Sequence, residues 1–180
     1  MTAGADDAAW AHLAANLTRI VAELEAGGAR TETLATLVER RPLLGVSRRP
    51  IMRRVSRVWR LRELLLDERA SVYRVGSVIR VAKQPDHYSE QSTLAAERRR
   101  VQLAAVRSGF ELGETVNYDA TSLELSDANG RDAHPGIEVS DGEVVVHWGA
   151  VPGAASADGA ASASPLVPYL DDAVALLIGR

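Results

Sequence analysis

The stretch from Arg53 to Lys83 constrains the fold most, because it combines the densest apolar run with a segment rich in β-branched residues. Trp59–Leu66 begins with alternating apolar and charged residues and ends in three leucines, which is typical of a strand that becomes buried on both faces. Asp67–Ala70 is polar and of turn length. Val72–Val81 has strand composition, and Gly76 within it indicates a bulge or a close approach by another backbone. We therefore predict a central β-hairpin made by these two strands.

A helix-turn-helix is the alternative interpretation of this region. Leu34–Leu37 would then lie in the first helix, Gly45–Ser47 would form the turn and N-cap, and the basic residues that follow would form a recognition helix. The strand Tyr73–Val81 would belong to a wing. Pro42 falls inside the supposed turn and Pro50 lies early in the supposed helix, so the hairpin is favoured.

The N-terminal third carries helix signals. Apolar residues at helical spacing predict an amphipathic helix from Asp6 to Ala26, which the pair Gly27-Gly28 ends. A second, short helix is predicted from Thr31 to Pro42, with Leu34, Leu37 and Val38 facing inward. Ile51–Val58 alternates imperfectly and is predicted as an edge strand, where arginines would block unwanted strand pairing.

The rest of the chain carries further sequence signals for one helix and several short strands. Ser92 is an N-cap for a helix that runs to Ser108 with Leu94 in its apolar stripe, and Gly109 is suited to end it. Shorter strands are predicted near 113–118 and 122–126. Asp141-Gly142, between Ile137–Ser140 and Glu143–Trp148, predicts a tight hairpin.

Together these elements predict an α+β fold. We expect an antiparallel sheet of about five or six strands, two N-terminal helices, one central helix and a C-terminal helix. Residues 1–148 would form the α+β domain, with 1–42 as its helical part. Residues 149–164 are rich in alanine, glycine and serine and predict a flexible linker. Residues 165–180 predict a helix that docks back, with Asp171 and Asp172 in its first turn.

Composition limits the classes of function. The 180-residue chain has no cysteine, so it has neither a disulfide framework nor a thiolate metal site. The histidines are not spaced as metal ligands; they are His12, His87, His134 and His147. No glycine-rich nucleotide motif is present, and we predict no cofactor. The start lacks a signal-peptide pattern and no apolar run reaches membrane-spanning length, so we expect a cytoplasmic location and no membrane partner.

Charge is distributed unevenly. Residues 1–108 carry 19 basic and 12 acidic side chains, whereas residues 109–180 carry 2 and 12. An arginine-rich surface would suit an anionic ligand, a protein partner, a second copy of this chain or a nucleic acid. The candidate binding residues are Arg60, Arg62, Arg80 and Arg99, with Arg60 and Arg62 on one strand face and Arg80 opposite them across the hairpin.

Two other classes of function remain open. A winged-helix-like regulator would bind DNA through Arg40–Arg62, a region with nine arginines and no carboxylate. Its candidate contacts are Arg48, Arg49, Arg53, Arg54 and Arg57. An enzyme would have to assemble its site from distant residues such as Tyr73, Asn117 and His147.

Four ordered segments resemble a small actinobacterial protein family of unknown function, over roughly residues 53–180. The segments are WRLRELLLDERASVYRVGSVIRVA (59–82), AAERRRVQLAAVRSGFELGETVNY (95–118), DGEVVVHW (141–148) and YLDDAVALL (169–177). The resemblance brings an association with the label glutaminase, which would imply an amidohydrolase. A serine-type glutaminase needs a Ser-x-x-Lys pair, and the sole lysine, Lys83, lies six residues after Ser77. No catalytic residue is therefore assigned, and we predict a non-catalytic binding or interaction module.

Overall fold

The computed structural model describes residues 3–40, 49–83, 92–123, 125, 136–147 and 163–179. These residues form an α+β fold with a mixed seven-stranded sheet, in the order β5-β6-β1-β2-β3-β4-β7, and a three-stranded sheet, β10-β9-β8. The elements in chain order are α1 (Ala3–Ala26), β1 (Glu32–Val38), β2 (Ile51–Leu61), β3 (Leu64–Asp67), β4 (Val72–Arg74), β5 (Ser77–Arg80), α2 (Thr93–Arg107), β6 (Thr115–Tyr118), β7 (Thr121–Leu123), β8 (Ile137–Ser140), β9 (Glu143–His147), β10 (Ala163–Pro165) and α3 (Leu166–Leu177). No helix in this part of the chain is long and apolar enough to cross a membrane.

The chain divides into two compact units, each built from separate stretches of sequence. Unit 1 comprises residues 1–30, 59–73 and 122–180, and unit 2 comprises residues 31–58 and 74–121. Each unit has its own apolar core, so each can be described by itself.

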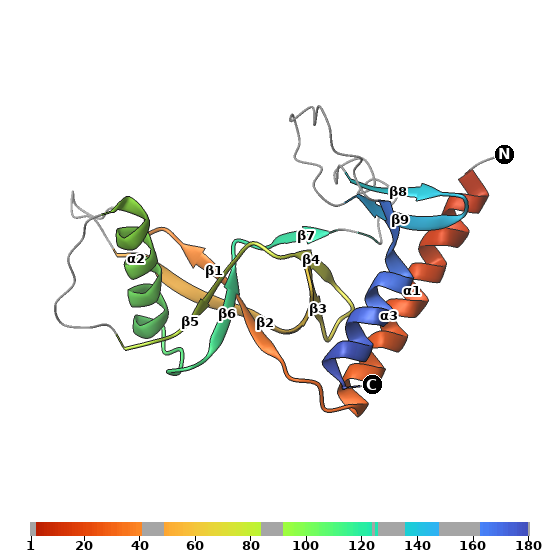
Figure 1. Ribbon diagram of the computed structural model, residues 1–180. Helices are drawn as coiled ribbons and strands as arrows, with labels where there is room; N and C mark the ends of the chain where they lie inside the picture. The colour runs from red at the N-terminus through yellow and green to blue at the C-terminus, as the bar shows by residue number, and fades with distance from the viewer. Residues whose placement is uncertain are drawn as a thin grey trace. The chain divides into compact units, whose positions relative to one another are not determined.

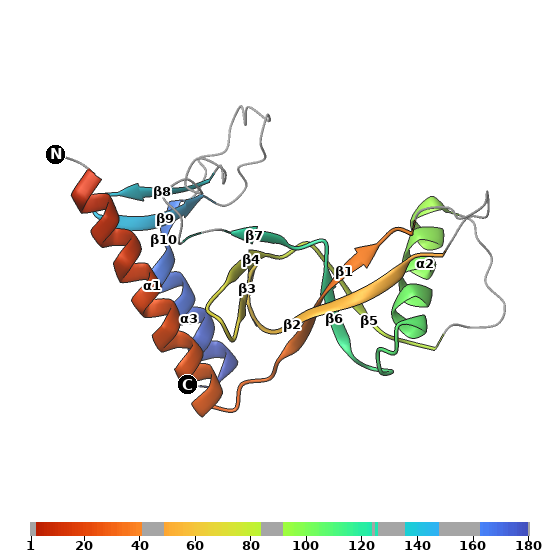
Figure 2. The same cartoon turned by 180° about the vertical axis from the view of Figure 1, so that it is seen from behind.

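In unit 1, α1 and α3 lie side by side and run in the same direction (Figures 1 and 2). The β8–β9 hairpin packs beside α1, and β9 brings Val144 and Val146 into the core. One stripe of α1 faces this core, because apolar residues recur at helical spacing from Trp10 to Leu24. In α3, Leu170 is fully buried. The α3 helix therefore packs against α1 and β9 within unit 1.

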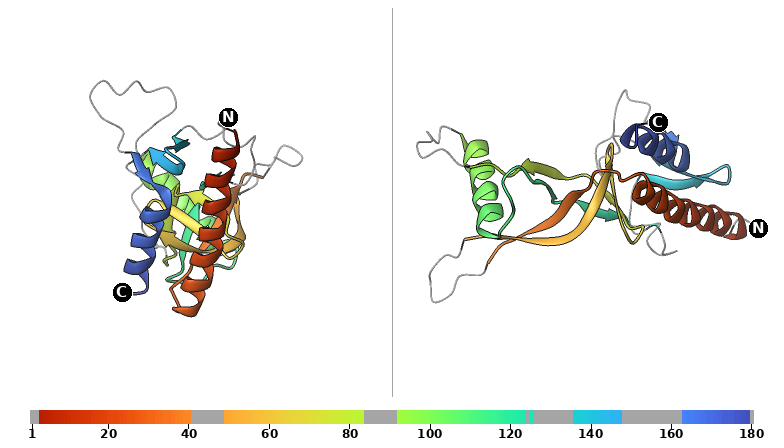
Figure 3. Two further views of the ribbon diagram at one scale, coloured as in Figure 1. Left: turned by 90° about the vertical axis from the view of Figure 1, so that its right-hand side faces the viewer. Right: turned by 90° about the horizontal axis from the view of Figure 1, so that it is seen from below.

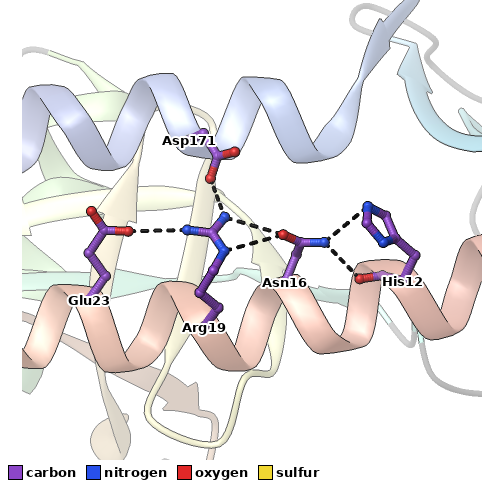
Figure 4. Close-up of polar contacts among 5 residues, drawn as sticks. All are labelled: His12, Asn16, Arg19, Glu23 and Asp171. Atoms are coloured by element: carbon purple, nitrogen blue, oxygen red, sulfur yellow. Dashed lines mark hydrogen bonds and ion pairs between the residues drawn. The ribbon is translucent and has the colours of Figure 1, made fainter.

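A polar network joins α1 to α3 at their exposed side (Figure 4). The Arg19 guanidinium donates to Asp171 of α3 at 2.5 Å and to Glu23 at 3.1 Å. Asn16 accepts from Arg19 and donates to the His12 carbonyl. Since these side chains are solvent-exposed, the network orients the two helices more than it stabilises them.

Unit 2 places α2 on one face of the strands β5, β6, β1 and β2, and the two views of Figure 3 show this helix from different sides. The core between helix and sheet holds Val101 and Ala105 of α2 against Ile79 and Val116. Gln102 anchors the helix to β5, because its amide donates to the Arg80 carbonyl at 2.8 Å and accepts from the Ala82 N–H at 3.2 Å. This sheet is mixed rather than purely antiparallel, since β1 and β6 run parallel.

The predicted second helix is wrong: residues 32–38 form the strand β1. The segment alternates only until Leu34 and Ala35, which are both buried because the register with β2 shifts between them. That bulge disguises the period of two, so the apolar residues imitate helical spacing. Residues 51–58 are extended as predicted and pair with β1, and the strand that they begin, β2, lies between β1 and β3 in the sheet.

The predicted central hairpin is only partly correct. Trp59–Leu66 is broken after Leu61, where Arg62 adopts a φ of 59° and reverses the chain into β3. Val72–Val81 is broken around Gly76, whose backbone passes so close to Asp119 that a Cβ would lie 2.1 Å from the Asp119 carbonyl oxygen. Consequently β4 pairs beside β3, whereas β5 pairs with β6. The alternative recognition helix is also wrong, because residues 51–61 form β2.

The predicted ends of α1 and α2, the N-cap of α2 and the Asp141-Gly142 turn are confirmed. Gly28, with a φ of 61°, ends α1, and the Ser92 hydroxyl accepts the Ala95 N–H at 3.1 Å at the start of α2. Gly109, with a φ of 78°, ends α2. The Asp141-Gly142 turn has positive φ at both residues, as a type I′ hairpin requires.

Three finer predictions are wrong; they concern the apolar face of α2, the extent of the linker and the start of α3. Leu94 is 62% exposed and takes no part in the apolar face of α2. The last part of the predicted linker forms β10, which pairs with β9; the remainder, 149–162, lies outside the described residues. The α3 helix begins at Leu166, so Asp171 and Asp172 lie beyond its first turn and do not cap it.

Candidate ligand-binding cavity

The turn between β3 and β4 is organised by one buried carboxylate. Asp67 is 3% exposed, and its Oδ1 accepts the backbone N–H of Arg69 at 2.9 Å and of Ser71 at 2.8 Å. Its Oδ2 accepts the Tyr73 hydroxyl at 3.2 Å. Aspartate favours such turns because its short side chain hydrogen-bonds the backbone that follows. The carboxylate thus fixes the path of residues 67–73.

Tyr73 is the titratable group of this turn whose pKa is displaced. Partial burial raises the pKa of Tyr73, and the charge and hydrogen bond of Asp67 raise it further. A hydrogen bond with Ser71 and the charge of Arg69 act in the opposite direction, but they do not reverse the shift. The phenol therefore stays protonated at neutral pH and serves as a hydrogen-bond donor to Asp67.

The same turn forms one wall of a cavity of about 370 Å³ in unit 1. Further lining residues come from α1, from the end of β7 and from Leu125. The lining residues are mainly apolar with a few polar members: Trp10, Leu13, Ala14, Leu17, Thr18, Arg69, Ala70, Ser71, Val72, Ser122, Leu123 and Leu125. Small-molecule sites have volumes of about 300–1,000 Å³ and this kind of lining.

Local structure explains why the cavity walls are firm. Leu13 and Leu17 are buried on the core-facing stripe of α1, and Val72 is 2% exposed. The β3–β4 turn is held by the three hydrogen bonds of Asp67. Ala70 completes this turn with a φ of 61°, a conformation that residues other than glycine rarely adopt. A helix and a hydrogen-bonded turn therefore present the lining side chains.

Arg69 is the one charged residue among the described residues of the lining. Both carboxylate oxygens of the neighbouring Asp67 are engaged by two backbone N–H groups and a phenol, not by the guanidinium. Among the described residues, Arg69 makes no salt bridge. Its described lining therefore combines apolar and polar side chains with one positive charge.

The four arginines predicted as a binding surface are divided between the two units. Arg62 occupies the β2–β3 turn, and its guanidinium lies 5.6 Å from the centroid of the Tyr169 ring, within cation–π range. The Tyr169 hydroxyl also accepts the Glu63 N–H at 3.2 Å. Arg60 is half-buried on β2. Arg62 thus has a structural role in unit 1.

Arg80 and Arg99 belong to unit 2, where they lie on different layers. Arg80 is exposed on β5, and its neighbours Ile79 and Val81 face the core beneath α2. Its side chain therefore points to the other face of the sheet, while Arg99 is half-buried on α2. The predicted placement of Arg80 opposite Arg60 and Arg62 is wrong, because β5 pairs with β6.

The candidate nucleic-acid residues are also divided. Arg54 forms a two-pronged ion pair with Glu114, with Nη2 to Oε2 at 2.9 Å, and its guanidinium stacks 4.1 Å from the centroid of the Phe110 ring. Arg57 donates to the Thr31 hydroxyl. Arg49 and Arg53 are exposed, and Arg48 lies outside the described residues. Two of the five side chains are thus committed to contacts within unit 2.

Glu114 is the hub of that cluster. Partial burial acts to raise its pKa, but hydrogen bonds from Arg54, Thr33 and the Glu111 N–H outweigh burial, and the pKa of Glu114 is lowered. The same pair raises the pKa of Arg54, first through the hydrogen bond with Glu114. The ion pair links β2 to the segment before β6, so Arg54 and Glu114 have a structural role within unit 2.

The residues considered for a dispersed catalytic site do not share a unit. Asn117 is fully buried in unit 2 and donates to Glu32 at 2.7 Å. Tyr73 and His147 belong to unit 1, where His147 lies 3.0 Å from Glu138. Within the part of the chain that the structure describes, no group of histidine, aspartate or glutamate residues is placed to hold a metal ion.

Sequence reasoning missed the cavity because its walls come from three distant segments. Asp67–Ala70 was identified only as a turn, and nothing in the pattern joins it to α1 or to Ser122–Leu125. The available signal was the aspartate that opens the turn, which fixes the conformation of Arg69 and Ser71. Comparisons with protein-family models, curated proteins and solved structures found no match to this chain.

Proposed function

We propose that this protein is a non-catalytic binding protein that holds a small, largely apolar molecule in the cavity of unit 1. The observation that carries this proposal is the cavity itself, with an apolar lining on α1 and a hydrogen-bonded turn facing it. Burying an apolar ligand there would release about 25 cal/mol per Å² of apolar surface removed from water. The firm walls limit the ordering cost of binding.

A catalytic role has less support from the same residues. In the part of the lining that the structure describes there is no histidine, carboxylate or lysine, which are the usual general acids and bases. The nearby side chains of Asp67 and Tyr73 are already engaged in the hydrogen bonds that hold the β3–β4 turn. The phenol of Tyr73 has a raised pKa, which is the opposite of what an activated nucleophile needs. Binding without turnover is therefore the function that these groups support best.

The test uses a neutral fluorescent probe and two matched variants of the full chain. The probe 1-aminoanthracene is apolar and uncharged, so its binding does not depend on Arg69. Ala14 and its neighbour Ala15 are both exposed on α1, but Ala14 lines the cavity and Ala15 does not. A14W should fill the cavity and abolish saturable binding of the probe, while A15W should bind like the wild type.

The proposal fails if the wild-type chain shows no saturable 1:1 enhancement of the probe's fluorescence. It also fails if A14W and A15W bind equally, because the probe would then lie elsewhere. Far-UV circular dichroism and a urea titration of each variant confirm that both remain folded.

A further inference from the structure

We infer that the ligand carries a carboxylate at one end, and that Arg69 is the residue that selects it. This inference rests on the proposed function, because it specifies the ligand class for the same cavity. The ligand would be a small amphiphile, with an aliphatic or aromatic body among the leucines and its anionic end against the guanidinium. Nothing in the inference requires a covalent step.

The first support is the electrostatic balance of the cavity. Among the described residues its lining holds one cation, Arg69, and no carboxylate, an arrangement that favours an anion over a neutral or cationic ligand. Asp67 is close in sequence, but its two oxygens are engaged by Arg69 N–H, Ser71 N–H and the Tyr73 hydroxyl. The carboxylate that would otherwise be the natural partner of the guanidinium is used to build the turn.

The second support is the geometry of the donors. A guanidinium presents its N–H groups as a planar fork, which matches the two oxygens of a carboxylate better than an ammonium does. Hydroxyl-bearing side chains line the same cavity, among them Thr18 and Ser122. The turn holds the Arg69 backbone through its N–H bond to Asp67, so the side chain starts from a fixed position.

The third support is the contrast with other arginines. Arg54 pairs with Glu114 and stacks on Phe110, and Arg19 pairs with Asp171. Arg69 has no such ion pair among the described residues, although it lies beside a cavity of ligand size. Arg69 is also exposed to solvent, so its guanidinium is accessible to a ligand that enters the cavity.

The experiment compares three ten-carbon ligands that share one tail: decanoate, decanol and decyltrimethylammonium. Each displaces 1-aminoanthracene from the full-length chain at neutral pH and below its micellar concentration. We expect decanoate to bind on the order of tenfold more tightly than decanol, and the ammonium ligand to bind more weakly than decanol. A single charge-assisted contact at a partly exposed site supports a difference of this order.

Two arginine variants complete the test. R69Q should bring decanoate to within about twofold of decanol and leave decanol unchanged, whereas R69K should retain part of the preference, because it keeps the charge without the fork. The matched control is R30Q, which removes the same charge from an exposed position of unit 1 outside the lining. R30Q should preserve the full preference for decanoate.

The possible outcomes separate the two proposals. If decanoate and decanol compete equally well in the wild type, or if R30Q removes the preference as fully as R69Q, the carboxylate inference is overturned and the cavity proposal stands. If none of the three ligands displaces the probe, and A14W does not affect the probe, both proposals fall.

Discussion

Replacing Asp67 tests the contact that shapes the cavity wall. The variant D67A removes three hydrogen bonds at once from a side chain that is 3% exposed: those from the Arg69 N–H, the Ser71 N–H and the Tyr73 hydroxyl. A hydrogen bond to a charged group contributes about 1.5–3 kcal/mol. The two backbone groups lie in a surface turn and regain water, so we expect a total loss of about 3 kcal/mol.

Two further variants divide this loss. D67N keeps one oxygen as an acceptor for the two backbone N–H groups and should cost only about 1 kcal/mol. E68A is the matched control, since Glu68 is an exposed neighbour in the same turn, and its effect should stay within about 0.5 kcal/mol. Urea unfolding at neutral pH gives the free energies, and amide hydrogen exchange at Arg69 and Ser71 reports the turn itself. If D67A and E68A destabilise the protein equally, the carboxylate does not hold the turn.

The Tyr73 phenol adds a pH dependence whose sign follows from its raised pKa. Since the folded-state pKa lies above the unfolded value of about 10, the contribution is complete below that pH. It is lost as the pH rises through the folded-state value. Y73F should remove this alkaline loss, and unfolding experiments between neutral and alkaline pH would show it.

Three other changes test separate parts of the fold. G76A should destabilise unit 2 by about 3 kcal/mol in urea unfolding, because a Cβ would lie 2.1 Å from the Asp119 carbonyl oxygen. The control G4A adds the same methyl group in open space and should not destabilise the protein. A70G should raise stability by about 0.5 kcal/mol, because Ala70 holds a φ of 61°; a loss of stability would argue against strain there. The Arg54–Glu114 pair should give a coupling energy of about 1 kcal/mol in a double-mutant cycle. Because the pKa of Glu114 is lowered, this coupling should be present above the unfolded-state pKa and vanish as the pH falls through the folded-state value, and a coupling that grew in acid would contradict the assignment.

Elements with strong local signals were predicted correctly from the sequence. Both long helices are marked by residues whose geometry depends on a few neighbours, such as Ser92 at the start of α2 and Gly28 at the end of α1. The Asp141-Gly142 turn is local in the same sense. Short-range hydrogen bonds and positive φ values decide these features, so a single sequence contains the necessary information.

The errors arise where distant contacts override local preference. Residues 32–38 become extended because they pair with β2 and β6, and the bulge at Leu34 and Ala35 hides the alternation. The chain reverses between β2 and β3 at Arg62, which has a positive φ although it is neither glycine nor asparagine. The sequence therefore contains no turn signal at this position. The break at Gly76 depends on Asp119, which lies more than forty residues away.

The candidate site was beyond sequence reasoning for the same reason. The predicted arginines were chosen for density, but Arg54 and Arg62 are used in contacts with Glu114 and Tyr169. Arg69 lies in a turn with ordinary composition. It becomes notable only because it lines the same cavity as α1 and the end of β7.

The most direct measurement is a titration of the ¹⁵N-labelled full chain with decanol, followed by two-dimensional NMR. Decanol has no charge, so the result does not depend on the role of Arg69. Saturable shifts concentrated at Ala14, Ser71 and Leu123, with Ala104 and Val116 of unit 2 unchanged, are what a ligand cavity in unit 1 predicts. Shifts spread over both units, or confined to unit 2, would contradict a binding site at this cavity.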